Sequence, residues 1–305
     1  DSPRILRIAY TEDPELLVDY FSNTLLAQNL YRLHSQPQWG TTGTSEPVPL
    51  LVDELPSYEN GGLSINEEGN TVIQFRIADW AVWSDGTPIT VDDFILPVDI
   101  ASDGISAILS YRVLDGTGAT VEQGETEKDV IITYPFPYPD WVFSQLIPLP
   151  AHILRPEYEA LLAEGRGFEN STFLRNPVVS NGPFVFAEWI TGSYIRLVRN
   201  ENYWADVWFD EIQLQFFQNA NVIEQLMLAG EIDMTNYILP TSRSVELADE
   251  NASLDVSLFF ASLRLELKLN LGPNGHPALK DVRVRRALAM AVDRQFMVDE
   301  IYNGA

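Results

Sequence analysis

The amino-acid sequence predicts an α/β protein with two lobes. Its 305 residues, 46% of which are hydrophobic, are more than a single hydrophobic core usually serves. Segments in which hydrophobic and polar residues alternate, as in strands, are interspersed with segments of helical spacing. Proline and glycine accumulate from Gln36 to Pro49, which indicates a crossing between lobes.

Strands are expected where hydrophobic and polar side chains alternate. Such runs occur at residues 5–10, 71–77, 129–134, 211–217 and 254–260. The clearest local structure is a β-hairpin, because two alternating runs, residues 184–189 and 194–199, flank Thr191-Gly192-Ser193.

Helices are expected where apolar residues recur every three or four positions behind a capping residue. These helices lie at residues 24–33, after Thr90, at residues 222–228 and after Asp281. The acidic residues Asp92 and Asp93 suit the positive end of the dipole of the second helix. No segment repeats, which excludes solenoids and propellers.

The charge balance excludes two classes of partner. With 19 basic and 44 acidic residues, the chain carries a formal charge of -25, which repels nucleic acid and anionic membrane surfaces. No run of about 18 apolar residues occurs, so direct membrane insertion is not expected. The sequence has no cysteine, which excludes a disulfide framework, a thiolate zinc site and a cysteine nucleophile.

Four motifs follow one another in the chain: FRI with VWSDGTPITVDDF (75–94), SNGPF with EW, RN and YW (180–204), AGEIDMT (229–235), and N with DVRVRRA and DR (270–294). Any one can arise by accident, but four in order are specific. Together they resemble the landmarks of the family 5 solute-binding proteins, the oligopeptide and dipeptide receptors of ABC importers. The first fifty residues match less well, because Glu12-Asp13-Pro14 replaces the family's Leu-Asp-Pro.

The resemblance implies a fold of the periplasmic-binding-protein type II class, with two lobes that close by a hinge around a ligand. Residues 1–45 and 170–262 would form the first lobe, residues 46–169 an additional subdomain, and residues 263–305 the start of the second lobe. Because relatives continue for roughly another 200 residues, we expect the second lobe to be incomplete and the chain to be a piece of a longer protein.

The resemblance also implies a function. The expected protein is a monomeric receptor outside the cytoplasmic membrane, in the periplasm or anchored to the cell surface. It would capture oligopeptides or dipeptides between its lobes and deliver them to ABC permease subunits, without a chemical step. The same fold can instead bind an oligosaccharide, a nickel chelate or another solute. A carbohydrate-active enzyme using paired carboxylates is a remote alternative.

A peptide bound by this class of receptor resembles an added strand, held mainly by main-chain hydrogen bonds. The loop after the third motif, Asn236, Tyr237 and Ile238, is therefore expected to touch the ligand; the alternative is an ordinary surface loop. Glu266 stands where the family has a cleft-facing aromatic residue near the hinge, and its alternative is the solvated face of a strand.

Two further ligand-binding residues are expected in the first lobe. Asp19 lies near the family's first ligand-contacting segment and can pair with a ligand ammonium group, unless it is a surface carboxylate. Asn181 approaches the ligand or, with Gly182, gives a tight lead into the hairpin. No catalytic residue, metal ligand or cofactor is expected.

Histidines and tryptophans are assigned structural roles. His34, His152 and His276 are far apart and match no catalytic or metal-binding spacing, so each is expected in a loop or on the surface. Five tryptophans suggest sugar stacking, but core packing is preferred because three of them, Trp83, Trp189 and Trp204, occupy structural positions of the family.

Overall fold

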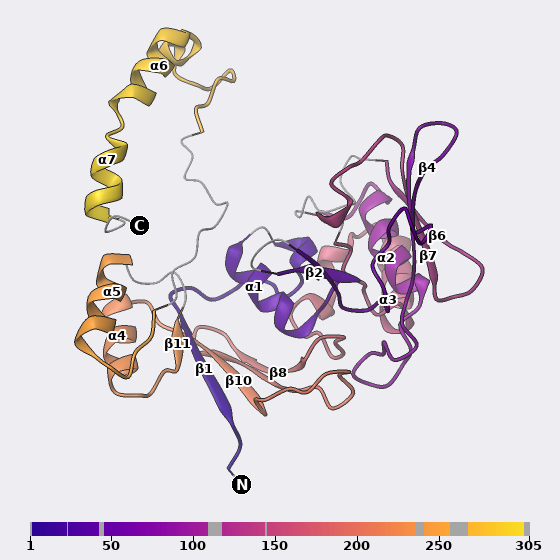
Figure 1. The fold of residues 1–305 in the computed structure, drawn as a ribbon, viewed down its shortest axis with the longest axis horizontal. Coiled ribbons are helices and arrows are strands. Elements are labelled where there is room, and N and C mark those ends of the chain that lie inside the picture. Colours follow the sequence, from indigo (N-terminus) through magenta and orange to yellow (C-terminus); the bar gives the residue numbers. More distant parts are fainter. Residues whose placement is uncertain are drawn as a thin grey trace. The chain divides into compact units, whose positions relative to one another are not determined.

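The computed structural model describes residues 2–22, 24–42, 46–108, 118–143, 145–235, 241–256 and 268–301. The chain divides into two compact units, Asp1–Met234 and Thr235–Ala305. The first unit contains two larger β-sheets (Figure 1). Each sheet has its own hydrophobic core.

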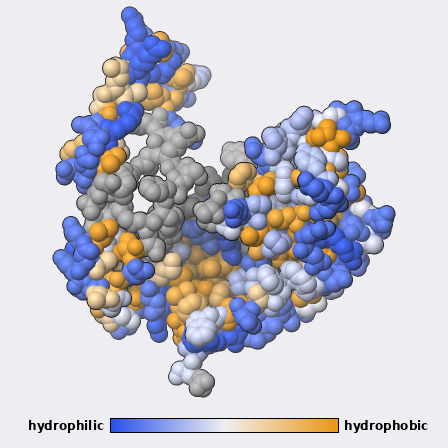
Figure 2. Space-filling model, in the orientation of Figure 1, coloured by the Kyte–Doolittle hydropathy of each residue, from blue (hydrophilic) through white to orange (hydrophobic). Residues whose placement is uncertain are grey.

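A five-stranded sheet has the order β11-β1-β10-β9-β8. Its strands are β1 (Ile5–Tyr10), β8 (Phe184–Ile190), β9 (Tyr194–Arg199), β10 (Glu211–Phe216) and β11 (Met234–Thr235). β1 and β10 are parallel, with Tyr10 opposite Phe216, whereas β8, β9 and β10 are antiparallel neighbours. Leu26 and Leu30 of α1 (Leu25–His34) are buried in the core of this sheet, as the helical spacing predicted. Figure 2 shows hydrophobic residues gathered over this sheet, among more hydrophilic loops.

A four-stranded antiparallel sheet has the order β4-β5-β7-β6. Its strands are β4 (Leu63–Ile65), β5 (Thr71–Arg76), β6 (Thr120–Gln123) and β7 (Asp129–Tyr134). Two helices, α2 (Val91–Ser102) and α3 (Ala151–Ala163), share its core. A separate pair, β2 (Trp39–Thr41) with β3 (Pro47–Pro49), lies in the segment predicted to cross between lobes.

One buried aspartate caps both of these helices. The carboxylate of Asp93 accepts hydrogen bonds from the backbone N–H of Thr90 at 2.8 Å and of Ala151 at 2.8 Å. Burial nevertheless raises the pKa of Asp93 to about 6. The predicted helix start at Thr90 is therefore confirmed, and its acidic first turn also organises the start of α3.

The remaining helical elements are short. In the first unit they are the turns Asp19–Phe21, Trp141–Phe143, Phe168–Asn170 and Thr172–Leu174 and helix α4 (Ala220–Leu228). In the second unit they are α5 (Thr241–Glu250), Pro277–Lys280, α6 (Val282–Ala291), α7 (Arg294–Phe296) and Met297–Ile301. Asp281 caps α6 as predicted, and the apolar side chains of Leu288 and Met290 on this helix are exposed. Among the described residues, no helix combines the length and hydropathy needed to cross a membrane.

Candidate ligand-binding site

The carboxyl edge of the parallel strands β1 and β10 is the first candidate site. From β10 the chain passes through α4 to β11, which lies on the other side of β1. Such a reversal of strand order separates the connections at the carboxyl ends of the strands, and α/β proteins bind ligands in the crevice that results. The loops that begin after Tyr10 and Phe216 meet there, where the N–H of Phe217 donates to the carbonyl of Tyr10 at 2.8 Å.

The tip of the β8–β9 hairpin borders the same edge. Tyr194 is opposite Gln215, and the N–H of Phe216 donates to the carbonyl of Ser193 at 2.9 Å. Asp13, in the loop after β1, accepts hydrogen bonds from the indole N–H of Trp189 at 3.0 Å and from the backbone N–H of Gly192 at 2.6 Å. Asp13 was not among the predicted site residues and belongs to a poorly matching motif, although an aspartate directly before a proline at a strand end was the available signal.

Four of the six predicted ligand-binding residues lie outside the described residues. Asn236, Tyr237 and Ile238 belong to residues 236–240, and Glu266 belongs to residues 257–267. The predicted strand at residues 254–260 also falls mostly in the second of these segments. Their contacts with a ligand stay predictions.

Asp19 is not a surface carboxylate. It is 2% exposed and begins a helical turn, Asp19–Phe21, in which the N–H of Ser22 donates to its carbonyl. The turn is tied down by the hydroxyl of Tyr20, which donates to the carbonyl of Ile147 at 2.7 Å and accepts from the N–H of Ile147. The solvated alternative is therefore wrong, and pairing with a ligand ammonium group stays a prediction.

Asn181 is 2% exposed and binds the protein's own backbone. Its amide oxygen accepts from the N–H of Gln36 at 2.9 Å, and its amide nitrogen donates to the carbonyl of Gln36 at 2.9 Å. The next residue, Gly182, donates its N–H to the carbonyl of His34 at 3.1 Å. These bonds support the tight lead into the hairpin, while a ligand contact of Asn181 stays a prediction.

The first two sequence motifs meet at this point. The N–H of Ser84 donates to the carbonyl of Ser180 at 2.8 Å, and the N–H of Ser180 donates back to the hydroxyl of Ser84 at 3.1 Å. The amide nitrogens of Asn200 and Asn202 donate to the carbonyls of Gly182 and Ser84, respectively, each at 2.9 Å. We call this group of residues the seam; its members are Ser84, Ser180, Asn181, Gly182, Asn200 and Asn202. It joins the segment between β5 of the four-stranded sheet and α2 to the two ends of the hairpin of the five-stranded sheet.

Replacing Asn181 by alanine is expected to lower the free energy of unfolding by about 2 kcal/mol, because it leaves the part-buried backbone N–H and carbonyl of Gln36 without this partner. Urea unfolding of both proteins measures the difference. Asn202→Ala is the control, since the hydrogen bond from its side-chain amide to the carbonyl of Ser84 is exposed and its loss should cost less than about 1 kcal/mol. Equal stabilities of the two variants would contradict this role of Asn181.

Two structural predictions from the sequence were wrong. His34 lies in helix α1 with 2% exposure, where its Nε2 contacts the carbonyl of Leu17 at 3.2 Å. Burial lowers the pKa of His34 to about 4. Core packing is also wrong for three of the five tryptophans, because Trp80, Trp204 and Trp208 are 38%, 50% and 70% exposed. The rings of Trp204 and Trp80 contact each other, with centroids 5.0 Å apart. Trp83, at 1% exposure, is in the core as predicted.

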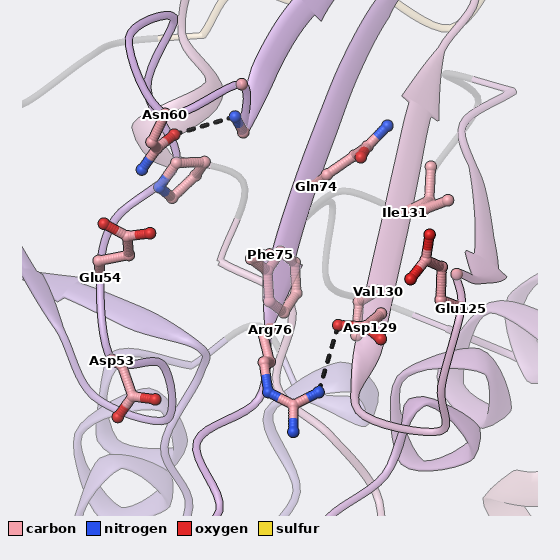
Figure 3. Close-up of a pocket in the computed structure, with 14 residues that line it drawn as sticks. Asp53, Glu54, Asn60, Gln74, Phe75, Arg76, Glu125, Asp129, Val130 and Ile131 are labelled. Carbon is pink, nitrogen blue, oxygen red and sulfur yellow. Dashed lines mark hydrogen bonds and ion pairs between the residues drawn. The ribbon is translucent and has the colours of Figure 1, made fainter.

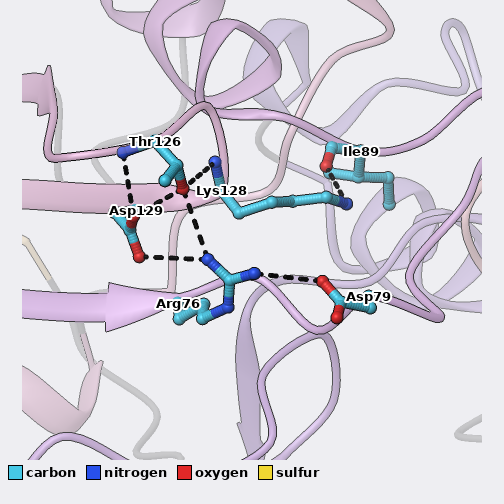
Figure 4. A network of polar contacts seen from close by, with 6 residues as sticks. All are labelled: Arg76, Asp79, Ile89, Thr126, Lys128 and Asp129. Carbon is cyan, nitrogen blue, oxygen red and sulfur yellow. Dashed lines mark hydrogen bonds and ion pairs between the residues drawn. The ribbon is translucent and has the colours of Figure 1, made fainter.

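A hollow of about 410 Å³ on the four-stranded sheet is a poorer candidate for binding a peptide (Figure 3). Asp53 and Glu54 line one side, and Glu125 lines the opposite side beyond Arg76. The guanidinium of Arg76 is already bound by Asp79 at 3.2 Å, by Asp129 at 3.5 Å and by Thr126 at 3.3 Å (Figure 4). Arg76 is the one cationic residue among those that line the hollow, and its guanidinium is already bound by neighbouring side chains. The hollow is therefore a poor site for the carboxylate end of a peptide.

The second cation near this network is also occupied. The ammonium of Lys128 donates to the carbonyl of Ile89 at 2.7 Å, and burial lowers the pKa of Lys128 (Figure 4).

His152 contacts the carboxylate of Asp85 at 3.0 Å. Among the described residues, no group of three or more histidines or carboxylates has the arrangement of a metal site.

Known proteins similar to this chain are solute-binding proteins. The model of the bacterial extracellular solute-binding proteins, family 5 middle, matches residues 46–305. The periplasmic oligopeptide-binding protein OppA of Escherichia coli is 26% identical over 274 residues, which are 83% of this chain and 48% of OppA. The chain spans about half the length of the curated relatives it matches.

Two solved structures share the fold. The oligopeptide-binding protein AppA of Bacillus subtilis, in complex with a nonapeptide, has a TM-score of 0.72 at 20% identity, covering 99% of this chain and 57% of AppA. NikZ of Campylobacter jejuni, in complex with Ni(L-His), has a TM-score of 0.68 at 21% identity, covering 98% of this chain and 55% of NikZ. The likeness confirms the predicted fold class. With a family model matching residues 46–305, the chain belongs to family 5 of the bacterial extracellular solute-binding proteins.

Proposed function

We propose that this chain supplies the ligand-capturing first lobe of a peptide receptor for an ABC importer, acting outside the cytoplasmic membrane. The observation that carries the proposal is the match to the family 5 model over residues 46–305. The relatives OppA of Escherichia coli and AppA of Bacillus subtilis are both named as oligopeptide-binding proteins, which favours a peptide as the ligand.

The proposed ligand lies at the carboxyl edge of β1 and β10. Asn236, Tyr237 and Ile238, the proposed contact residues of the second unit, directly follow β11 in the sequence. An extended peptide can add main-chain hydrogen bonds there without a demand on its side chains, and ordered water fills the remaining space. The proposed division of the chain is residues 1–45 and 170–262 for the first lobe, 46–169 for the additional subdomain and 263–305 for the start of the second lobe. The receptor acts as a monomer, delivers its ligand to permease subunits and performs no chemical step.

Native mass spectrometry of the natural full-length protein tests this function. The expected result is a heterogeneous set of co-purified peptides, identified after denaturation by their fragmentation. Peptides that bind with micromolar or tighter affinity when added back would support the proposal. A single homogeneous sugar or metal chelate would overturn the peptide assignment.

A metal chelate is the second candidate ligand. The observation that favours it is the likeness to NikZ in complex with Ni(L-His), which covers 98% of this chain. Calorimetric titration of the natural full-length protein with Ni²⁺ and histidine together separates the two candidates, because a peptide receptor should show no heat of binding. Binding that required both nickel and histidine would establish the chelate.

A further inference from the structure

The loop between β1 and the turn Asp19–Phe21 is held at two points. Near its start, the carboxylate of Asp13 accepts from Trp189 and Gly192 on the β8–β9 hairpin at 3.0 and 2.6 Å. Near its end, the N–H of Leu17 donates to the carbonyl of Leu174 at 2.8 Å. The path of the backbone across the carboxyl edge is therefore fixed by contacts from two other parts of the first unit.

The hydrogen bonds that Asp13 accepts are of a strong kind. Each carboxylate oxygen takes one N–H donor, and hydrogen bonds to an ionised acceptor are roughly twice as strong as neutral ones. Gly192 has a φ of 73°, a left-handed conformation that glycine adopts at little cost, so the hairpin tip can turn tightly beside the loop. The indole of Trp189 is itself packed beneath the guanidinium of Arg175, 5.7 Å from the ring centroid.

Resting on the proposed receptor function, we propose that Asp13 is a positioning residue for ligand binding. In this role it acts through residues 11–18, which it holds in the conformation that meets the ligand, because each of its two oxygens accepts a hydrogen bond from the hairpin. A loop ordered before binding loses less conformational entropy when the ligand arrives, so affinity is higher.

The test compares Asp13→Asn with Asp210→Asn in the natural full-length protein. Asp210 is the matched control because it lies at the opposite edge of the same strands, directly before β10, and its carboxylate also binds two partners, Arg4 and Arg199. Each variant is titrated with the peptides that co-purify with the wild type, well below its own melting temperature. Trp189→Phe removes one of the two hydrogen-bond donors to Asp13, and it replaces Asp13→Asn in the test if that variant does not fold.

Asp13→Asn is expected to raise the dissociation constant about tenfold, from the loss of one charge-assisted bond, while Asp210→Asn leaves it unchanged. Trp189→Phe should weaken binding in the same direction by a smaller factor. An Asp13 variant that melts earlier but binds like the wild type would show a purely structural role and overturn the inference. A wild-type protein that binds no peptide would instead refute the proposed function.

Discussion

Replacing Gly182 by alanine is expected to lower the free energy of unfolding by about 3 kcal/mol or more. A Cβ at this position would lie 2.6 Å from the carbonyl carbon of His34 and 2.9 Å from the backbone nitrogen of Ser35. Backbone atoms cannot rotate aside, so the two segments must separate. Their separation also weakens the bond from Gly182 to His34 and the bond from Asn200 to Gly182.

Urea unfolding followed by circular dichroism measures this change. Gly40→Ala is the control, because its added Cβ would meet side-chain atoms of Leu50, the nearest at 3.1 Å, and of Val48 at 3.9 Å, and side chains can move. The control should cost less than about 1 kcal/mol. If Gly182→Ala proved as mild as Gly40→Ala, the close approach at the seam would be refuted.

His34 is expected to make the protein less stable in acid. Burial lowers the pKa of folded His34 from the ordinary 6.5 to about 4, so the unfolded chain takes up this proton first. The stability that neutral His34 contributes is complete above pH 6.5 and is lost as the pH falls through 4. At about 1.4 kcal/mol per pKa unit, the loss is about 3 to 3.5 kcal/mol.

The measurement is the stability difference between the wild type and His34→Gln, taken at several pH values from 7 to 3.5. The difference is needed because Asp93 acts in the opposite direction. Its pKa is raised from 3.8 to about 6, so its contribution is present below pH 3.8 and is lost as the pH rises through 6. Both proteins share that contribution, and it cancels. A difference independent of pH would contradict the assignment to His34.

The local structure was largely predictable from the sequence because strands and helix starts depend on short-range patterns of side chains. The alternation at residues 5–10 and 129–134 gave the bounds of β1 and β7, and the capping side chain of Thr90 gave the start of α2. Helix α3 was missed because Pro156, a residue that usually breaks helices, lies inside it. There Asp93, nearly sixty residues earlier, accepts the N–H of Ala151 at the start of the helix.

The candidate site was less predictable because burial depends on distant partners. Nothing local distinguishes the buried Asp19 from a surface aspartate, and nothing local shows that Asn181 binds Gln36. His34 was expected in a loop or on the surface because it matches no catalytic or metal-binding spacing. It is instead buried and forms hydrogen bonds with Leu17 and Gly182 of other segments. The family motifs identified the fold correctly, although the residues within them mostly hold the protein together.

The seam has a consequence for how the chain folds. Its bonds join residues that are 96, 118 and 145 positions apart in sequence. Bringing such distant segments together costs loop-closure entropy before any contact forms, so the hairpin and the capped helices should appear first and the seam last. Until then these hydrogen bonds do not connect the two parts of the first unit, so the nascent polypeptide can still bend between them.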